Sequence, residues 1–329
     1  MDLHLFKKLH AEGLIADDSL QKITALEEGR LFSLHWELKI LLYLGVTLLS
    51  GGLGVLVYKN IDTIGHQAIL SFIALVCAGC FYYCFRKKMP FTFFKVPPPN
   101  AFFDYILLLG CLTFITFIGY LQFEYTFFGN AYGLATFIPM VVLFFSAYFF
   151  DHLGVLSLAI TNLAAWAGIA VTPLRILKEN DFASERLIYT GVALGVLLIL
   201  AGLTSERRNF KKHFEFTYTN FGTHILFISG LAGLFTDDSI YLLWFIWLLG
   251  IAYLFYRQAL KKRSFYFLLI IALYLYIVLS YVVIKLLMQM SAAGLTPIYI
   301  GLLYFILSAI GLIRILIKLN KKVQAHDSL

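Results

Sequence analysis

The sequence has few charged residues for a chain of its length. Asp, Glu, Lys and Arg make up only 14% of the 329 residues, whereas 60% are apolar, and the mean hydropathy is +0.83. A soluble globular protein needs a charged exterior, because it cannot hide this much apolar surface from water. The scarcity of charge therefore excludes a soluble fold and predicts an integral membrane protein surrounded by the lipid bilayer.

The sequence also lacks the short motifs of familiar soluble-type catalysis. It contains no phosphate-binding glycine loop, no metalloprotease motif and no serine-nucleophile elbow. The net charge of +7 comes from basic residues in short clusters between apolar runs, which is typical of membrane topology and excludes nucleic acid as a partner. The first 37 residues have no apolar core of the signal-peptide type, so we expect no cleavable signal.

Cysteine is scarce as well, with four in the chain. Cys77, Cys80 and Cys84 are three and four residues apart, so they share one face of a predicted helix. Three thiols could begin a soft-metal site, but a closed structural zinc site needs a fourth ligand. Because Cys also serves as a small apolar filler, we predict packing roles for these residues, and neither a metal nor a cofactor.

Long apolar runs dominate the rest of the chain, and none alternates as a strand would. A membrane-spanning helix needs about 20 mostly apolar residues, and its backbone groups must pair within their own segment. The sequence therefore predicts an all-α polytopic membrane protein with ten spanning helices. They cover approximately residues 38–58, 66–85, 101–123, 131–150, 152–172, 186–204, 221–236, 239–256, 264–288 and 297–317.

The positions of Lys and Arg predict the orientation of these spans. With the N-terminus in the cytoplasm, 21 of the 26 Lys and Arg residues fall in inner loops or tails and only four fall on the outer side. Cytoplasmic loops carry such an excess of positive charge. We therefore predict that both termini are cytoplasmic.

Two short patterns recur in the same order along the chain. "AYFF" at 147–150 is echoed by "AYLF" at 252–255, and "IYTG" at 188–191 is echoed by "IYIG" at 298–301. Either these are chance matches in apolar sequence, or they indicate two parallel copies of a four-span unit. The repeat hypothesis divides the chain into four parts, which are a hairpin at 1–37, two helices and a basic loop at 38–100, and four-helix units at 101–216 and 217–329.

The first 37 residues form a polar segment that predicts a cytoplasmic hairpin of two short helices. Gly13 stands where a helix C-terminal cap belongs, and Asp18 with Gln21 has the spacing of a capping box. Helices this short are not stable alone, so their apolar stripes must pack against each other, the membrane surface or a protein partner.

This hairpin and the span after it carry a family resemblance. "EGLIADDSLQKI" at 12–23 leads into the glycine-rich "LYLGVTLLSGGLGVLVYKNID" at 42–62. The combination, over about residues 5–65, resembles the start of a family of predicted bacterial membrane proteins catalogued as domain of unknown function 2157. That family has no agreed activity. The resemblance therefore implies a multi-pass protein of the bacterial cytoplasmic membrane, and it implies no catalytic residues.

Few polar side chains are predicted to lie within the membrane. Asn162 is the most central strongly polar residue, with Thr161 and Trp166 beside it in the fifth span, and Asp104 lies near the inner end of the third span. These four residues are our candidates for a substrate path. The alternative for Asn162 is a hydrogen bond that holds neighbouring helices together, which is a common use of polar side chains in membranes.

A second set of candidates lies at the predicted outer face. Lys285 interrupts the apolar sequence of the ninth span near its outer end, and it would either snorkel to the interface or pair with an acidic residue over an outward-facing cavity. The candidate outer-face cluster comprises Asp62, His66, Glu124, Asp237 and Lys285. On the inner side, Asp151 and His152 are predicted to form a solvated turn, with proton transfer as the alternative.

Three classes of function are compatible with these observations. The first is a transporter or permease for a small solute, supported by the many spans and the central Asn162. The second is an accessory protein that docks a protein partner through residues 1–37. The third is an enzyme that acts on lipid-linked substrates at the outer face, although the missing motifs favour a protein that is not an enzyme.

Overall fold

The protein is built from α-helices. The computed structural model describes residues 9, 10, 12, 15–17, 19, 40–49, 51–55, 65–100, 102–171, 184–236, 239–289 and 296–324, among which no strand occurs. An apolar helix at Ile40–Val55 precedes α4 (His66–Lys87), α5 (Phe103–Tyr125), α6 (Tyr132–Phe150), α7 (Leu153–Val171), α8 (Glu185–Arg207), α9 (Glu215–Thr236), α10 (Tyr241–Lys261), α11 (Phe265–Gln289) and α12 (Thr296–Gln324). A short 3-10 helix, η2 (Lys212–Phe214), leads into α9.

Eight of these helices, α4 to α8 and α10 to α12, are long and apolar enough to cross a membrane. The prediction of an all-α polytopic membrane protein is therefore confirmed. The two other predicted spans are also helical, at Ile40–Val55 and α9. The break predicted between the seventh and eighth spans is present, because α9 ends at Thr236 and α10 begins at Tyr241.

Helix α9 differs from the eight apolar helices because 11 of its 22 residues are buried in the protein. Its buried residues include Thr217, Thr219 and Thr223, and the Thr223 hydroxyl donates a hydrogen bond to the Thr219 carbonyl at 2.7 Å. A helix buried in this way needs no continuous apolar surface toward lipid. The predicted start at residue 221 was six residues late, because the polar first turn beginning at Glu215 packs inside the protein.

The chain divides into two compact units. Unit 1 comprises Met1–Lys88 and Pro98–Phe117, and unit 2 comprises Met89–Pro97 and Ile118–Leu329. In unit 1, α4 contacts α5 at Gly110, where an added Cβ would lie 2.9 Å from that of Cys80. The Cys77 thiol donates a hydrogen bond to the Gly110 carbonyl at 3.6 Å. These cysteines thus lie in a close helix–helix contact.

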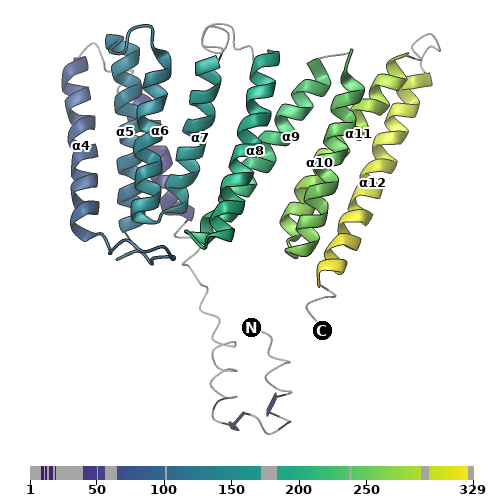
Figure 1. Ribbon diagram of the computed structural model, residues 1–329, viewed down its shortest axis with the longest axis horizontal. Coiled ribbons are helices and arrows are strands. Elements are labelled where there is room, and N and C mark those ends of the chain that lie inside the picture. The colour runs from purple at the N-terminus through teal and green to yellow at the C-terminus, as the bar shows by residue number, and fades with distance from the viewer. Residues whose placement is uncertain are drawn as a thin grey trace. The chain divides into compact units, whose positions relative to one another are not determined.

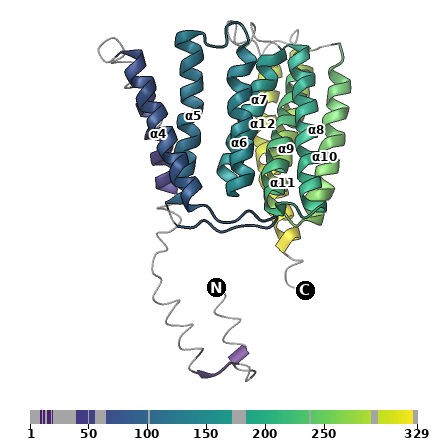
Figure 2. The same ribbon diagram turned by 60° about the vertical axis from the view of Figure 1, so that its left-hand side comes forward.

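In unit 2, helices α8 and α9 lie side by side along their length (Figures 1 and 2). Their contact depends on glycines. A Cβ added at Gly195 would lie 3.1 Å from the Gly222 carbonyl oxygen, and one added at Gly222 would lie 3.0 Å from the Gly195 carbonyl oxygen. Small residues let membrane helices approach until their backbones touch. The resulting packing contacts drive helix association in lipid, where the hydrophobic effect between helices is absent.

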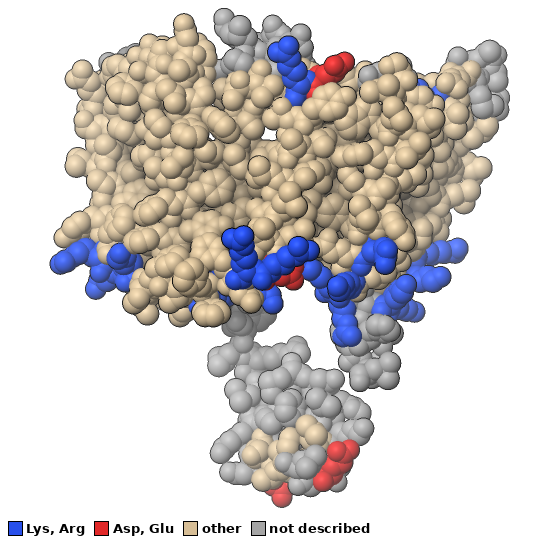
Figure 3. Space-filling view, viewed as in Figure 1, with Lys and Arg blue, Asp and Glu red and all other residues tan. Residues whose placement is uncertain are grey.

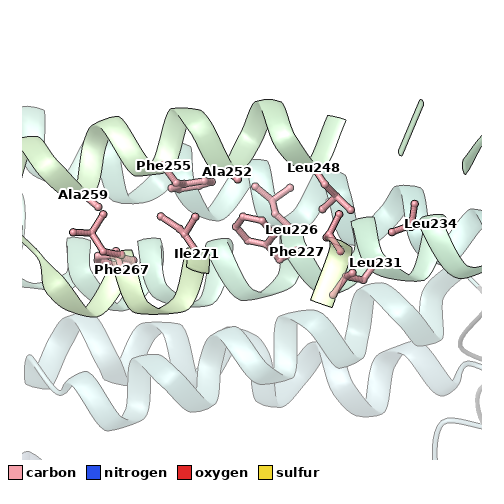
Figure 4. Close-up of a cluster of buried hydrophobic side chains, with 12 residues drawn as sticks. Leu226, Phe227, Leu231, Leu234, Leu248, Ala252, Phe255, Ala259, Phe267 and Ile271 are labelled. Carbon is pink, nitrogen blue, oxygen red and sulfur yellow. The ribbon is translucent and has the colours of Figure 1, made fainter. Parts of the chain in front are cut away.

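The core of unit 2 lies between α9, α10 and α11. Leu226, Phe227 and Leu234 of α9 meet Leu248 and Phe255 of α10, together with apolar residues of α11 (Figure 4). The Phe227 ring also stacks on Tyr274 of α11, with 4.7 Å between ring centroids. Dispersion contacts of this kind hold the three helices together in lipid.

Lys and Arg residues gather at one end of the unit 2 helices, which we call the basic end (Figure 3). This end contains the α8–α9 and α10–α11 turns and the C-terminal part of α12. The positive-inside rule predicts that it faces the cytoplasm. The basic residues of unit 2 near it are Lys95, Arg207, Arg208, Lys211, Lys212, Arg257, Lys261, Lys262, Arg263, Arg314, Lys318, Lys321 and Lys322.

Two sequence-based proposals about the organisation of the chain stay predictions. The hairpin at 1–37 lies mostly outside the described residues, and within it His10 Nε2 is 2.6 Å from Asp17 Oδ1. The duplication of the units at 101–216 and 217–329 is likewise a proposal about chain history, made on sequence alone.

Candidate functional site

The residues of the predicted substrate path are held mainly by their own helices. On α7, the half-buried Asn162 amide donates to the Leu158 carbonyl at 3.4 Å, and the exposed Thr161 hydroxyl donates to the Ser157 carbonyl at 2.9 Å. The Trp166 ring packs 5.5 Å from the ring of Phe137 on α6. Asp104 lies apart from these residues in the sequence, in the first turn of α5 within unit 1.

The predicted outer-face cluster is only partly described. Asp62 and Asp237 lie outside the described residues, His66 is the first residue of α4 in unit 1, and Glu124 is an exposed residue near the end of α5. Lys285 on α11 is half-buried, and its ammonium lies 3.7 Å from the centre of the Tyr241 ring. A cation over an aromatic face is a favourable arrangement at the edge of a membrane.

A buried carboxylate lies at the basic end, between α6 and α7. Asp151 ends α6 in the left-handed conformation, with φ of 60°, which Asp adopts more readily than most residues. Its side chain is only 2% exposed and has three donors. His213 Nε2 is 2.6 Å and Lys211 Nζ is 3.2 Å from Oδ1, and the Val96 N–H donates to Oδ2.

The Lys211 side chain is buried to the same degree, with 1% exposed. Its ammonium donates to the Phe94 carbonyl at 3.3 Å and lies 5.1 Å from the centre of the Phe91 ring. Its backbone N–H donates to the Phe93 carbonyl at 2.8 Å. The segment 89–97 therefore covers the ion pair, and we call Asp151, Lys211 and His213 the buried ionic cluster.

The prediction of a solvated turn at Asp151 and His152 is wrong, because the Asp151 side chain and the residue His152 are buried. Two segments distant in sequence cover this turn, the segment 89–97 and the α8–α9 turn that carries Lys211 and His213. A buried carboxylate is tolerated only when charges and donors compensate for the lost water, and the cluster provides both. The cluster joins three parts of unit 2 at its basic end.

A second feature is a cavity of about 840 Å³ between the last three helices. Its lining runs from Leu249 to Tyr256 on α10, from Leu268 to Val283 on α11 and from Tyr304 to Leu319 on α12. These lining residues include no charged side chain, and only Tyr and Ser provide polar groups. Ligand sites typically have this size and this mostly apolar character.

Beside the cavity, α11 and α12 touch at two pairs of hydroxyl groups. Tyr276 Oη is 3.2 Å from Ser308 Oγ, and Ser280 Oγ is 3.1 Å from Tyr304 Oη. Toward the basic end, Gly311 lines the space, and a Cβ added there would meet no atom within 4 Å. Helix packing is thus fixed at the hydroxyl pairs and leaves room beside them.

The cavity is open to the side of the helices. Four of its lining residues are exposed, with 59% for Tyr253, 55% for Ile315, 47% for Leu279 and 37% for Leu249. They lie on helices that are apolar enough to cross a membrane. The molecules that reach the cavity from the side are therefore lipids rather than water.

At the basic end, Lys262 connects the α10–α11 turn to α8 and α9. Its ammonium donates to Glu206 Oε2 at 2.7 Å and to Glu215 Oε1 at 2.8 Å. Partial burial acts to lower the pKa of the Lys262 ammonium, but the hydrogen bonds and charges of the two carboxylates outweigh it. The pKa of Lys262 is therefore raised above its usual value of 10.5.

Replacing Lys262 with Met is expected to lower the free energy of unfolding by about 1 kcal/mol near neutral pH. Because the pKa is higher in the folded state, this stabilisation is fully present below the unfolded-state pKa and is lost as the pH rises through the folded-state value. Chemical unfolding of both proteins in detergent, near neutral pH and at about pH 11, checks the expectation. A difference that is the same at both pH values would contradict it.

Comparison with known protein families gives a match for the N-terminal part of the chain. Residues 7–156 match the family described as Predicted membrane protein (DUF2157). The resemblance noted in the sequence is thereby confirmed, and the match reaches from the hairpin segment into α7. Neither the curated proteins nor the solved structures gave a match.

The cavity lies beyond the DUF2157 match, which ends in α7, whereas the cavity is formed by α10, α11 and α12. Sequence reasoning located these helices but missed the space between them. One signal was available, because Tyr276 and Ser280 on α11 repeat the four-residue spacing of Tyr304 and Ser308 on α12. Paired hydroxyl residues at that spacing on adjacent antiparallel helices indicate where the helices touch.

Proposed function

We propose that this protein, in the bacterial cytoplasmic membrane, binds the hydrocarbon chain of a membrane amphiphile in the cavity between α10, α11 and α12. The observation that carries the proposal is an uncharged cavity of about 840 Å³ that opens sideways among membrane-spanning helices. For a chain that comes from water, burial of each methylene group in the cavity contributes about 0.8 kcal/mol to the free energy of binding. For a chain that comes from the surrounding lipid, packing contacts with the cavity walls favour binding. The hydroxyls of Tyr276, Tyr304 and Ser308 offer a few fixed hydrogen-bonding positions.

This proposal favours a lipid-like substrate over a polar or ionic solute. Carriers that couple transport to ions usually place acidic or basic side chains inside the membrane, and the cavity lining contains no Asp, Glu, His, Lys or Arg. Asn162, on which a solute path was predicted, lies on α7 and outside this lining. Movement of an amphiphile between leaflets and action on a lipid-linked substrate both begin with the binding step that we propose.

The proposal predicts the effect of filling the cavity. Gly311→Phe places an aromatic ring in the cavity. The space beside Gly311 is open, because a Cβ added there would meet no atom within 4 Å. Displacing about two methylene groups of a bound chain lowers affinity about tenfold. The amount of lipid that copurifies with the protein in detergent, measured by extraction and mass spectrometry, is therefore expected to fall about tenfold.

Gly250→Phe is the matched control for this experiment. Gly250 lies on α10, an added Cβ there also meets no atom within 4 Å, and the residue is exposed and outside the cavity lining. The control is expected to retain the copurifying lipid. Equal lipid content in the Gly311→Phe protein and the unchanged protein, both folded, would refute the proposed function.

A further inference from the structure

Every charge on the helices that form the cavity is positive. From residue 239 to residue 324 the sequence contains nine Lys and Arg residues and no Asp or Glu. Among them, Lys262 is paired with Glu206 and Glu215, and Lys285 lies over the Tyr241 ring. This part of the protein therefore attracts anions.

Three of these cations, Arg257, Lys318 and Lys322, are placed by helix geometry or a ring contact beside residues that line the cavity, toward its basic end. On α12, Lys318 follows Gly311 by seven residues and Lys322 follows Ile315 by seven, which places each on the face of the cavity-lining residue before it. On α10, the Arg257 guanidinium lies 6.0 Å from the centre of the Tyr253 ring, and Tyr253 lines the cavity. Because α12 continues to Gln324, beyond the predicted end at residue 317, both lysines belong to the regular helix.

We infer that the cavity's ligand is an anionic phospholipid, whose chain fills the cavity and whose phosphate group is bound by Arg257, Lys318 and Lys322. All three side chains belong to exposed residues at the end where the positive-inside rule predicts the cytoplasmic membrane surface. Basic side chains between membrane helices at that surface bind anionic headgroups. The inference rests on the proposed function, since the chain must occupy the cavity for its headgroup to reach these residues.

The inference is tested with the full chain in nanodiscs that contain equal amounts of phosphatidylglycerol and phosphatidylcholine with identical acyl chains. After transfer to detergent, the retained lipids are quantified by mass spectrometry. The unchanged protein is expected to retain at least about tenfold more of the anionic lipid, because three cations face its headgroup. In the triple variant Arg257→Gln, Lys318→Gln, Lys322→Gln the ratio is expected to fall close to one while the total retained lipid changes little.

The control triple variant is Lys212→Gln, Lys261→Gln, Lys321→Gln. It removes the same charge from exposed residues at the basic end, none of which is among the cavity's lining residues or in register with them. The control is expected to keep the preference for the anionic lipid. Equal loss of preference in both triple variants would overturn the inference, since it would show an effect of net surface charge alone.

Two further results separate this inference from the proposed function. If the unchanged protein retains both lipids equally, while Gly311→Phe lowers the retention of both, the headgroup inference fails and the chain-binding function stands. If Gly311→Phe changes nothing, the proposed function itself fails. Inorganic phosphate is expected not to displace the anionic lipid, because the chain supplies most of the binding, and displacement would assign the site to a free anion instead.

Discussion

Replacing Asp151 with Ala is expected to lower the free energy of unfolding by about 3–5 kcal/mol, the cost of removing one partner from a buried ion pair. The Lys211 ammonium, 1% exposed, would keep its burial but lose its counter-ion. The Val96 N–H would lose its acceptor as well. Chemical unfolding in detergent, followed by intrinsic fluorescence, measures the change.

Two companion variants make this expectation specific. The double variant Asp151→Leu, Lys211→Met removes both charges together, and it is expected to recover most of the stability that Asp151→Ala loses. Lys212→Ala changes the exposed lysine next to Lys211 and is expected to alter stability by less than about 0.5 kcal/mol. If Asp151→Ala is as stable as Lys212→Ala, the pair does not stabilise the fold in the way described.

The second large effect is expected at the α8–α9 contact. Gly222→Leu is expected to destabilise the protein by about 3 kcal/mol, because overpacking at a close contact forces the helices apart. A Cβ at this position would lie 3.0 Å from the Gly195 carbonyl oxygen and 3.2 Å from the Ile199 backbone nitrogen. Backbone atoms cannot rotate out of the way as the end of a side chain can.

Gly250→Leu serves as the control for Gly222→Leu. Both residues are glycines inside apolar helices, but an added Cβ at Gly250 meets no atom within 4 Å. The same assay is expected to show little loss of stability for Gly250→Leu. Similar losses in the two variants would mean that a large side chain destabilises any of these helices, and that the α8–α9 contact does not determine the result.

The helices could be predicted from the sequence because the length of an apolar run is a local property. Lipid thickness sets the number of residues needed, and backbone hydrogen bonding leaves the helix as the natural choice. For the last helix, the sequence predicted an apolar span at about 297–317, and α12 contains that span. The helix itself continues to Gln324, since lysines on a helix past the apolar region still suit the membrane interface.

The surroundings of individual polar residues could not be predicted in the same way. Asp151 looks like a turn residue when only its neighbours in sequence are considered, and its partners Lys211 and His213 follow about 60 residues later. Asn162 attracted attention because it is polar within an apolar run, yet its amide bonds the Leu158 carbonyl of its own helix. Burial and partners depend on which helices become neighbours, and a single sequence does not specify that.

The cavity was missed for a related reason. All of its lining residues except Ser308 and Gly311 are Leu, Ile, Val, Ala or Tyr, and such residues pack equally well in a closed core. Only the placement of α12 relative to α10 leaves the space open. The sequence shows that residues 239 to 324 contain nine Lys and Arg residues and no Asp or Glu. Their proposed role in binding an anionic lipid follows only when the cavity beside them is known.

Photocrosslinking tests the central claim, that a hydrocarbon chain occupies the cavity, most directly. A phospholipid with a photoactivatable group at the end of one acyl chain is incorporated with the protein in nanodiscs, illuminated, and the adducts are mapped by mass spectrometry. The account predicts adducts concentrated on cavity-lining residues such as Leu275 and Leu312. Adducts spread evenly over exposed residues outside the lining, such as Leu197 and Leu242, would contradict it.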